Sequence, residues 1–119
     1  MRIERELMRG AGPVAVLKLL ERREMYGYEL VAALNKRSDG VLTMGQSTLY
    51  PMLYNLEAKG LIESAQRLAP SGRERRYYRI TKKGRTQLAH TTEHWQAVVQ
   101  AMQALGIVPG GASPLEAGT

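Results

Sequence analysis

The feature of this sequence that most restricts its fold is a change in hydrophobic period near Leu61. Before Gly60, apolar residues recur at intervals of three and four, as in amphipathic helices. Residues 61–68 and 75–80 instead have the composition of β-strands, and the Pro- and Gly-containing segment 69–74 between them is typical of a turn. The sequence therefore predicts a β-hairpin with a basic tip, inserted between helical segments.

Apolar periodicity predicts helices on both sides of this hairpin. The expected segments run over residues 3–9, 13–23, 28–37, from 45–47 to 59, and from the N-cap Thr81 to about Leu105. Gly10, Gly12 and Pro13 separate the first two segments, and we expect a bend or a new helix start there. Pro51 conflicts with the helix that contains it, which predicts an irregular first turn or a kink.

This order of elements predicts an α+β, mostly α fold, namely a winged helix-turn-helix with a C-terminal helix. The winged helix-turn-helix domain would span residues 1–82, with the N-terminal helix 3–9. A dimerisation helix would span 83–105, and residues 106–119, which contain Gly and Pro without periodicity, would form a disordered tail.

The positive charge of the chain is concentrated in one stretch. The 119 residues carry a formal net charge of +6, and segment 61–87 contains eight basic but only two acidic residues. Charge concentrated in this way can follow a phosphate backbone. A solvated basic face would have the same composition, so charge alone leaves both interpretations open.

Several classes of protein are excluded by composition. The chain has no cysteine, which excludes disulfides, thiolate zinc sites and cysteine nucleophiles. No apolar run approaches the roughly 20 residues that span a bilayer, and the N-terminus does not resemble a signal peptide. We therefore expect a cytoplasmic protein without a membrane partner.

The helix that precedes the hairpin is the best candidate for reading DNA. If its leucines face inward, Tyr50 and Tyr54 face outward, and its first turn offers small polar side chains to a major groove. The arginines of the hairpin tip would lie along the neighbouring DNA backbone. The candidate DNA-binding residues are Gln46, Ser47, Thr48, Tyr50, Tyr54, Arg73, Arg75 and Arg76. Alternatively, the tyrosines cover the flank of the domain and the arginines form an idle basic surface.

The last helix carries an apolar stripe without an obvious partner in its own domain. Packing against a second copy would give a symmetric dimer, which suits a palindromic operator with paired half-sites. The candidate dimerisation residues are Leu88, Trp95, Val99, Met102 and Leu105. Trp95 could be interface core or could stack on a flat ligand at the seam.

No motif in the sequence indicates catalysis. His90 and His94 are four residues apart, but Glu does not directly follow the first histidine and no third ligand is evident. Two surface histidines explain this pair, and we expect no metal, no cofactor and no enzymatic activity.

Three segments closely resemble the PadR family of transcriptional regulators. They are Tyr26–Leu30 (YGYEL), Thr48–Ile62 (TLYPMLYNLEAKGLI) and Gly72–Gly84 (GRERRYYRITKKG), within a resemblance over residues 7–105. A Leu-Tyr-Pro sequence is common in the recognition helix of this family, which accounts for Pro51. The resemblance implies a homodimeric winged-helix repressor whose C-terminal helix forms the dimer interface.

The single extra helix is similar to the short branch of this family, which includes multidrug-binding regulators. In that branch a tryptophan of the dimerising helix stacks on flat aromatic ligands, and Trp95 matches its position. The resemblance implies an effector site that comprises Trp95, Val98, Val99, Leu7, Gly10 and Val14. The chain lacks the acidic residue that the branch's drug binder has four places after its tryptophan, so a neutral or anionic aromatic effector is as plausible as a cationic one. The predicted function is a sequence-specific DNA-binding repressor released by such an effector; the alternative is a winged-helix module that binds another protein.

Overall fold

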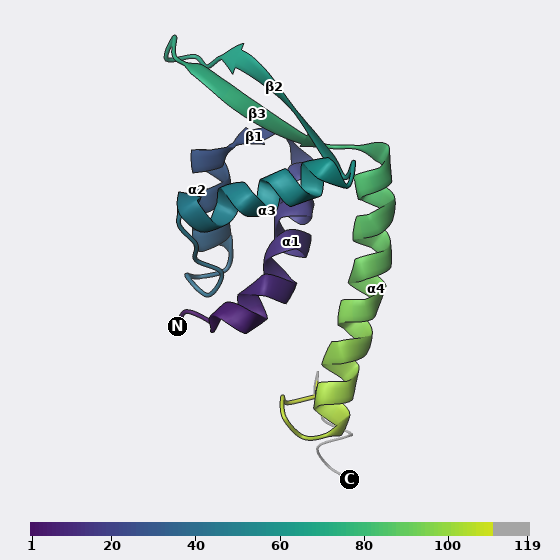
Figure 1. Cartoon of the computed structure of the whole chain (residues 1–119). Coiled ribbons are helices and arrows are strands. Elements are labelled where there is room, and N and C mark those ends of the chain that lie inside the picture. Colours follow the sequence, from purple (N-terminus) through teal and green to yellow (C-terminus); the bar gives the residue numbers. More distant parts are fainter. Residues whose placement is uncertain (111–119) are drawn as a thin grey trace. The chain divides into compact units, whose positions relative to one another are not determined.

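The computed structural model of the protein describes residues 1–110 (Figure 1). The elements are α1 (Arg5–Arg22), β1 (Met25–Tyr26), α2 (Gly27–Arg37), α3 (Gln46–Ala58), β2 (Ile62–Leu68), β3 (Glu74–Ile80) and α4 (Lys82–Ala104). The chain up to Leu88 forms one compact unit and the chain from Ala89 forms a second, so α4 begins in the first unit and continues in the second.

The first unit is a winged helix-turn-helix, as predicted. Its sheet has the antiparallel order β1-β3-β2, and the β2–β3 hairpin extends as a wing beyond the helices (Figure 1). The register pairs Ile62 with Ile80 and Met25 with Tyr78. Strand β1 was not predicted, because two residues are too few to show an alternating pattern.

Helix α1 corrects the prediction of two separate N-terminal helices. It continues from Arg5 to Arg22 with Gly10, Gly12 and Pro13 inside it. Gly12 is buried, and a Cβ at this position would lie 2.6 Å from the terminal methyl carbon of Met52. This glycine therefore leaves room for the Met52 side chain of α3 against α1, and tertiary packing of this kind outweighs the local helix-breaking tendency of the segment.

The turn between α2 and α3 is organised by Ser38. Its hydroxyl donates to the carbonyl oxygen of Leu34 (2.6 Å) and accepts from the backbone N–H of Leu42 (2.8 Å). Asp39 and Gly40 follow with positive φ angles of 53° and 80°, which reverse the chain after α2. Helix α3 then runs from Gln46 to Ala58 with Pro51 inside it.

Both ends of α4 are capped. Thr81 accepts a hydrogen bond from the backbone N–H of Gly84 (3.0 Å), which confirms its prediction as N-cap, and donates one to the carbonyl oxygen of Gly60 (2.6 Å). At the other end Gly106 has a φ of 79°, and the N–H of Ile107 donates to the carbonyl of Met102 (2.9 Å). The start of the predicted tail is thus a capping turn; residues 111–119 lie outside the described residues.

The core of the first unit consists of aliphatic side chains from all its helices and from the wing. Its most deeply buried side chains are Leu20, Leu30, Leu49, Leu53, Ile62 and Val16. Leu88 is also buried in this core, with 3% of its surface exposed. This corrects its prediction as a dimerisation residue, because a side chain packed inside its own unit has little surface left for a second copy.

No helix within residues 1–110 is both long and apolar enough to cross a membrane.

Candidate nucleic-acid interface

The first turn of α3 is exposed and polar. The side chains of Gln46, Ser47 and Thr48 are all accessible, and the N-cap residue Gly45 supplies no side-chain cap. The N–H of Thr48 donates to the carbonyl oxygen of Gly45 (3.1 Å), whereas those of Gln46 and Ser47 have no hydrogen-bond partner within residues 1–110. These two N–H groups lie at the positive end of the helix dipole, an arrangement that binds phosphate or a base edge.

The two tyrosines of α3 differ in their surroundings. Tyr54 is 74% exposed, whereas Tyr50 is 44% exposed. The hydroxyl oxygen of Tyr50 lies 2.5 Å from the position that a Cβ on Gly27 would occupy, so Tyr50 rests on the start of α2 and a side chain at position 27 would displace its ring. Tyr50 therefore contributes to packing as well as to the exposed surface, while Tyr54 is free of such a contact.

One face of the wing is joined to the end of α3. The hydroxyl of Ser64 on β2 donates to Oε2 of Glu57 (2.8 Å), and Nη1 of Arg76 on β3 donates to Oγ of Ser64 (3.0 Å). This chain of hydrogen bonds links the wing to the recognition helix. Burial raises the pKa of the neighbouring Tyr78 hydroxyl, and the nearby Tyr50 and Glu57 raise it further.

The opposite face of the wing carries a separate network of aromatic and charged groups. The guanidinium of Arg75 lies over the ring of Tyr26 (4.9 Å), and that of Arg67 lies over the ring of Tyr77 (4.2 Å). The two rings meet edge to face with centroids 5.5 Å apart, and Arg67 also pairs with Glu24. These arginines are thus held by contacts within the protein.

The adjacent arginines 75 and 76 therefore point to opposite faces, as strand geometry requires. Arg75 is half-buried, and its Nε is buried without a hydrogen-bond partner in the described structure. Arg73 stands at the wing tip, after a turn in which the N–H of Ala69 donates to its carbonyl (2.8 Å) and Gly72 has a φ of 86°. In the part of the chain that the structure describes, the Arg73 side chain makes no hydrogen bond or ion pair.

The basic side chains of segment 61–87 thus differ in whether they are already engaged by groups of the protein. Arg79 pairs with Glu63 (2.6 Å) and Lys83 donates to the carbonyl oxygen of Lys59 (2.9 Å). Among residues 1–110 Arg73 has no pairing partner at the tip, while Arg67 and Arg75 are engaged on the face described above. The predicted DNA-binding residues of α3 lie together on its first turns, but the three wing arginines do not form one cluster.

The residues predicted for an effector site belong to both units. Leu7, Gly10 and Val14 lie on α1 in the first unit, and Leu7 is 58% exposed. Within the second unit α4 exposes a row of large apolar side chains: Trp95, Val98, Val99, Met102 and Leu105. This exposed row is what a dimerisation surface requires; the effector site itself stays a prediction.

His90 and His94 lie side by side on α4, with ring centroids 4.5 Å apart. Among residues 1–110 no group of three or more His, Cys, Asp or Glu side chains could hold a metal ion.

The wing, the exposed recognition helix and the sequence agree with one protein family. The model of the transcriptional regulator PadR-like family matches residues 16–90. The chain belongs to this family. It is accordingly a transcriptional regulator and not an enzyme.

Three transcriptional regulators are similar to this chain over about two thirds or more of its length. The transcriptional regulator Rv3488 of Mycobacterium tuberculosis is 39% identical over 84 residues, which cover 71% of this chain and 75% of that protein. A PadR-like transcriptional regulator from Bacillus cereus has a TM-score of 0.75 at 30% identity, covering 84% of this chain and 95% of its own. PadR of Bacillus subtilis, crystallised with operator DNA, has a TM-score of 0.63 at 23% identity, covering 69% and 46%, and shares the fold.

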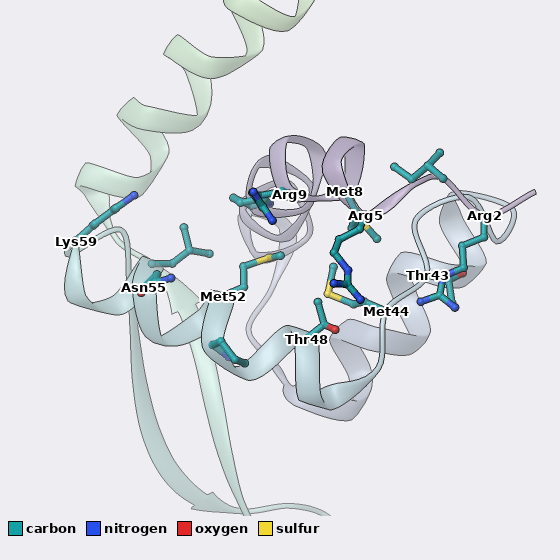
Figure 2. A pocket seen from close by; sticks show the side chains of 14 residues that line it. Arg2, Arg5, Met8, Arg9, Thr43, Met44, Thr48, Met52, Asn55 and Lys59 are labelled. Carbon is teal, nitrogen blue, oxygen red and sulfur yellow. The ribbon is translucent and has the colours of Figure 1, made fainter.

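A groove between α1 and α3 was not predicted from the sequence. Figure 2 shows Arg5 and Arg9 on its α1 side and Met52 and Asn55 on its α3 side. Arg5 and Arg9 are four residues apart, which places them near one face of α1, but this spacing does not specify the facing surface on α3.

Proposed function

We propose that this PadR-like protein is a homodimeric, sequence-specific DNA-binding repressor. The observation that carries the proposal is the exposed, polar first turn of α3, joined by hydrogen bonds to a wing whose tip presents Arg73, which is unpaired within residues 1–110. The helix would enter the major groove through Gln46, Ser47 and Thr48, with Tyr50 and Tyr54 at its sides. Arg73, and Arg76 on the α3 side of the wing, would follow the backbone.

The comparisons support DNA as the partner. PadR of Bacillus subtilis, which shares the winged-helix fold, binds operator DNA. A protein-interaction module would not need a recognition helix whose first turn is free of side-chain caps and open to solvent.

A dimer is supported by the exposed apolar row of α4. Trp95 is 37% exposed and Leu105 is 73% exposed within one chain, and burial of such side chains against a second copy is favourable by about 25 cal/mol per Å² of apolar surface. Two recognition helices related by a two-fold axis would bind the half-sites of a palindrome.

An aromatic effector at the dimer seam would release the repressor by linkage. A ligand that stacks on Trp95 and binds more tightly to a dimer whose recognition helices are wrongly spaced for DNA lowers operator affinity by that difference. A cytoplasmic location accompanies this proposal as a prediction.

The proposal is tested by fluorescence anisotropy with a palindrome from the promoter of the protein's own gene. We expect tight binding that weakens steeply with salt and exceeds binding to a scrambled duplex by at least about 10³-fold. Equal, weak binding to both duplexes would instead favour the protein-interaction module. Quenching of Trp95 by aromatic compounds, measured in parallel, tests the effector, which is rejected if quenching leaves DNA affinity unchanged.

A further inference from the structure

The groove between α1 and α3 is a hollow of the first unit to which the proposed function assigns no ligand. Its cavity volume is about 830 Å³, within the range of small-molecule sites. Its apolar lining includes Met8 from α1, Met44 from the segment before α3, and Met52 and Leu56 from α3 (Figure 2). Methionine side chains adapt their shape to an apolar ligand at little cost.

The charged residues around this groove are all positive. Arg2, Arg5 and Arg9 line it from the N-terminal side, and Lys59 lines it at the other end. No carboxylate is among the lining residues. None of these four side chains makes an ion pair with a carboxylate in the described part of the chain, whereas arginines 23, 67 and 79 do.

Polar groups that could complete a ligand's hydrogen bonds also line the groove. The hydroxyl of Thr48 and the carboxamide of Asn55 have no hydrogen-bond partner within residues 1–110, and both belong to α3. Thr43, by contrast, donates to the carbonyl oxygen of Gly40 (2.7 Å).

We propose that this groove binds an amphipathic monoanion, with an apolar chain or ring against the methionines and a carboxylate at the arginines. Arginine forms paired, charge-assisted hydrogen bonds with a carboxylate, and four cations without a carboxylate strongly favour an anion over a neutral or cationic ligand. DNA fits less well, because a polar sugar-phosphate backbone makes no favourable contact with the apolar methionine side chains of the groove. The apolar row on α4 of a second copy also fits less well. Residues 95–108 contain no carboxylate that could pair with the four cations of the groove.

Occupation of the groove would act on α3. The ligand would touch Thr48, Met52 and Asn55 from the side of α1, so it would change the position or rigidity of the recognition helix. This regulatory consequence rests on the proposed DNA binding; the binding site itself does not.

The test compares three probes with the same apolar chain: decanoate, 1-decanol and decyltrimethylammonium. Each is titrated into the full-length protein without DNA by calorimetry, below its micelle concentration. We expect decanoate to bind once per chain, at least about tenfold more tightly than the other two. The double variant Arg5→Gln/Arg9→Gln should lose this preference, whereas the matched control Arg22→Gln/Arg37→Gln, with the same change in net charge, should retain it.

The position of the ligand is tested by NMR of ¹³C-labelled methionine methyl groups. Decanoate should shift the signals of Met8, Met44 and Met52 and leave that of Met25, which lies on β1, in place. Equal affinity for the three probes, or shifts confined to Met102 that vanish in Trp95→Ala, would overturn the proposal. The proposal would also be overturned if Arg5→Gln/Arg9→Gln weakened self-association without changing decanoate binding. That result would show that a second copy covers the groove.

Discussion

The α-carbon of Gly84 lies against the carbonyl oxygen of Leu61, so that a Cβ at position 84 would overlap with that oxygen and lie 2.7 Å from Cγ1 of Ile80. The same carbonyl accepts a hydrogen bond from the backbone N–H of Thr81 (3.0 Å). The first turn of α4 is therefore docked on the start of β2 through backbone contacts, and only glycine permits this approach.

Gly84→Ala should destabilise the winged-helix unit. Because backbone atoms cannot move aside as a flexible side chain can, we expect the free energy of unfolding to fall by about 1–3 kcal/mol. Gly10→Ala is the matched control: it lies inside α1 with nothing within 4 Å of the added Cβ, and it should raise stability by about 0.5–1 kcal/mol. Urea denaturation at one protomer concentration measures both, and equal effects would contradict the close approach.

The two wing arginines 73 and 75 should differ in function. Arg73→Ala removes an unpaired cation from the tip and should reduce the slope of log K against log[salt] by about one per wing, without loss of stability. Arg75→Ala removes the contact with Tyr26 and should lower stability by about 0.5–1 kcal/mol, with little change in that slope. Anisotropy at several salt concentrations and thermal denaturation give the two readouts. The reverse pattern would place Arg75 on DNA and Arg73 in a structural role.

Alkaline pH should destabilise the protein partly through Tyr78. Burial raises the pKa of its hydroxyl, so the folded state favours the neutral form. The resulting stability is fully present below the ordinary tyrosine pKa of about 10 and is lost as pH rises through the folded-state pKa. Tyr78→Phe should therefore lose less stability than the wild-type protein between about pH 9 and 11, which is the range in which tyrosine titrates.

Tyr28→Phe is the control for this titration, because Tyr28 is 61% exposed. Its melting temperature should follow that of the wild type across the alkaline range. If the Tyr78→Phe and Tyr28→Phe variants respond equally, the hydroxyl of Tyr78 is not the group responsible.

Trp95→Ala should weaken self-association. Loss of a large aromatic side chain from the exposed row of α4 should raise the dimer dissociation constant at least about tenfold, whereas Gln96→Ala, at the neighbouring exposed position, should leave it unchanged. Sedimentation velocity over a range of concentrations measures this constant. A dimer of unchanged strength would show that Trp95 lies outside the interface.

The limits of the sequence prediction are seen in particular residues. The alternation of β3 could place Arg75 and Arg76 on opposite faces, but the partner of Arg75 is Tyr26, on a two-residue strand that leaves no periodic signal. Similarly, Gly12 and its sequence neighbours indicate a helix interruption. The structure instead places the side chain of Met52 against Gly12 within a continuous helix. Local propensity is a weak guide at such positions, because contacts from distant segments override it.

By itself, the sequence determined the helical segments, the wing, the cap at Thr81 and membership of the resembled family. Each of these depends on periodicity or on short motifs, which are properties of neighbouring residues. Only the tertiary structure decided that α1 is a single helix, that Leu88 is core, and that Arg67 and Arg75 are held on one face of the wing. It also revealed the cationic groove between α1 and α3. Those features arise from contacts between residues far apart in the chain, and no local pattern specifies such contacts.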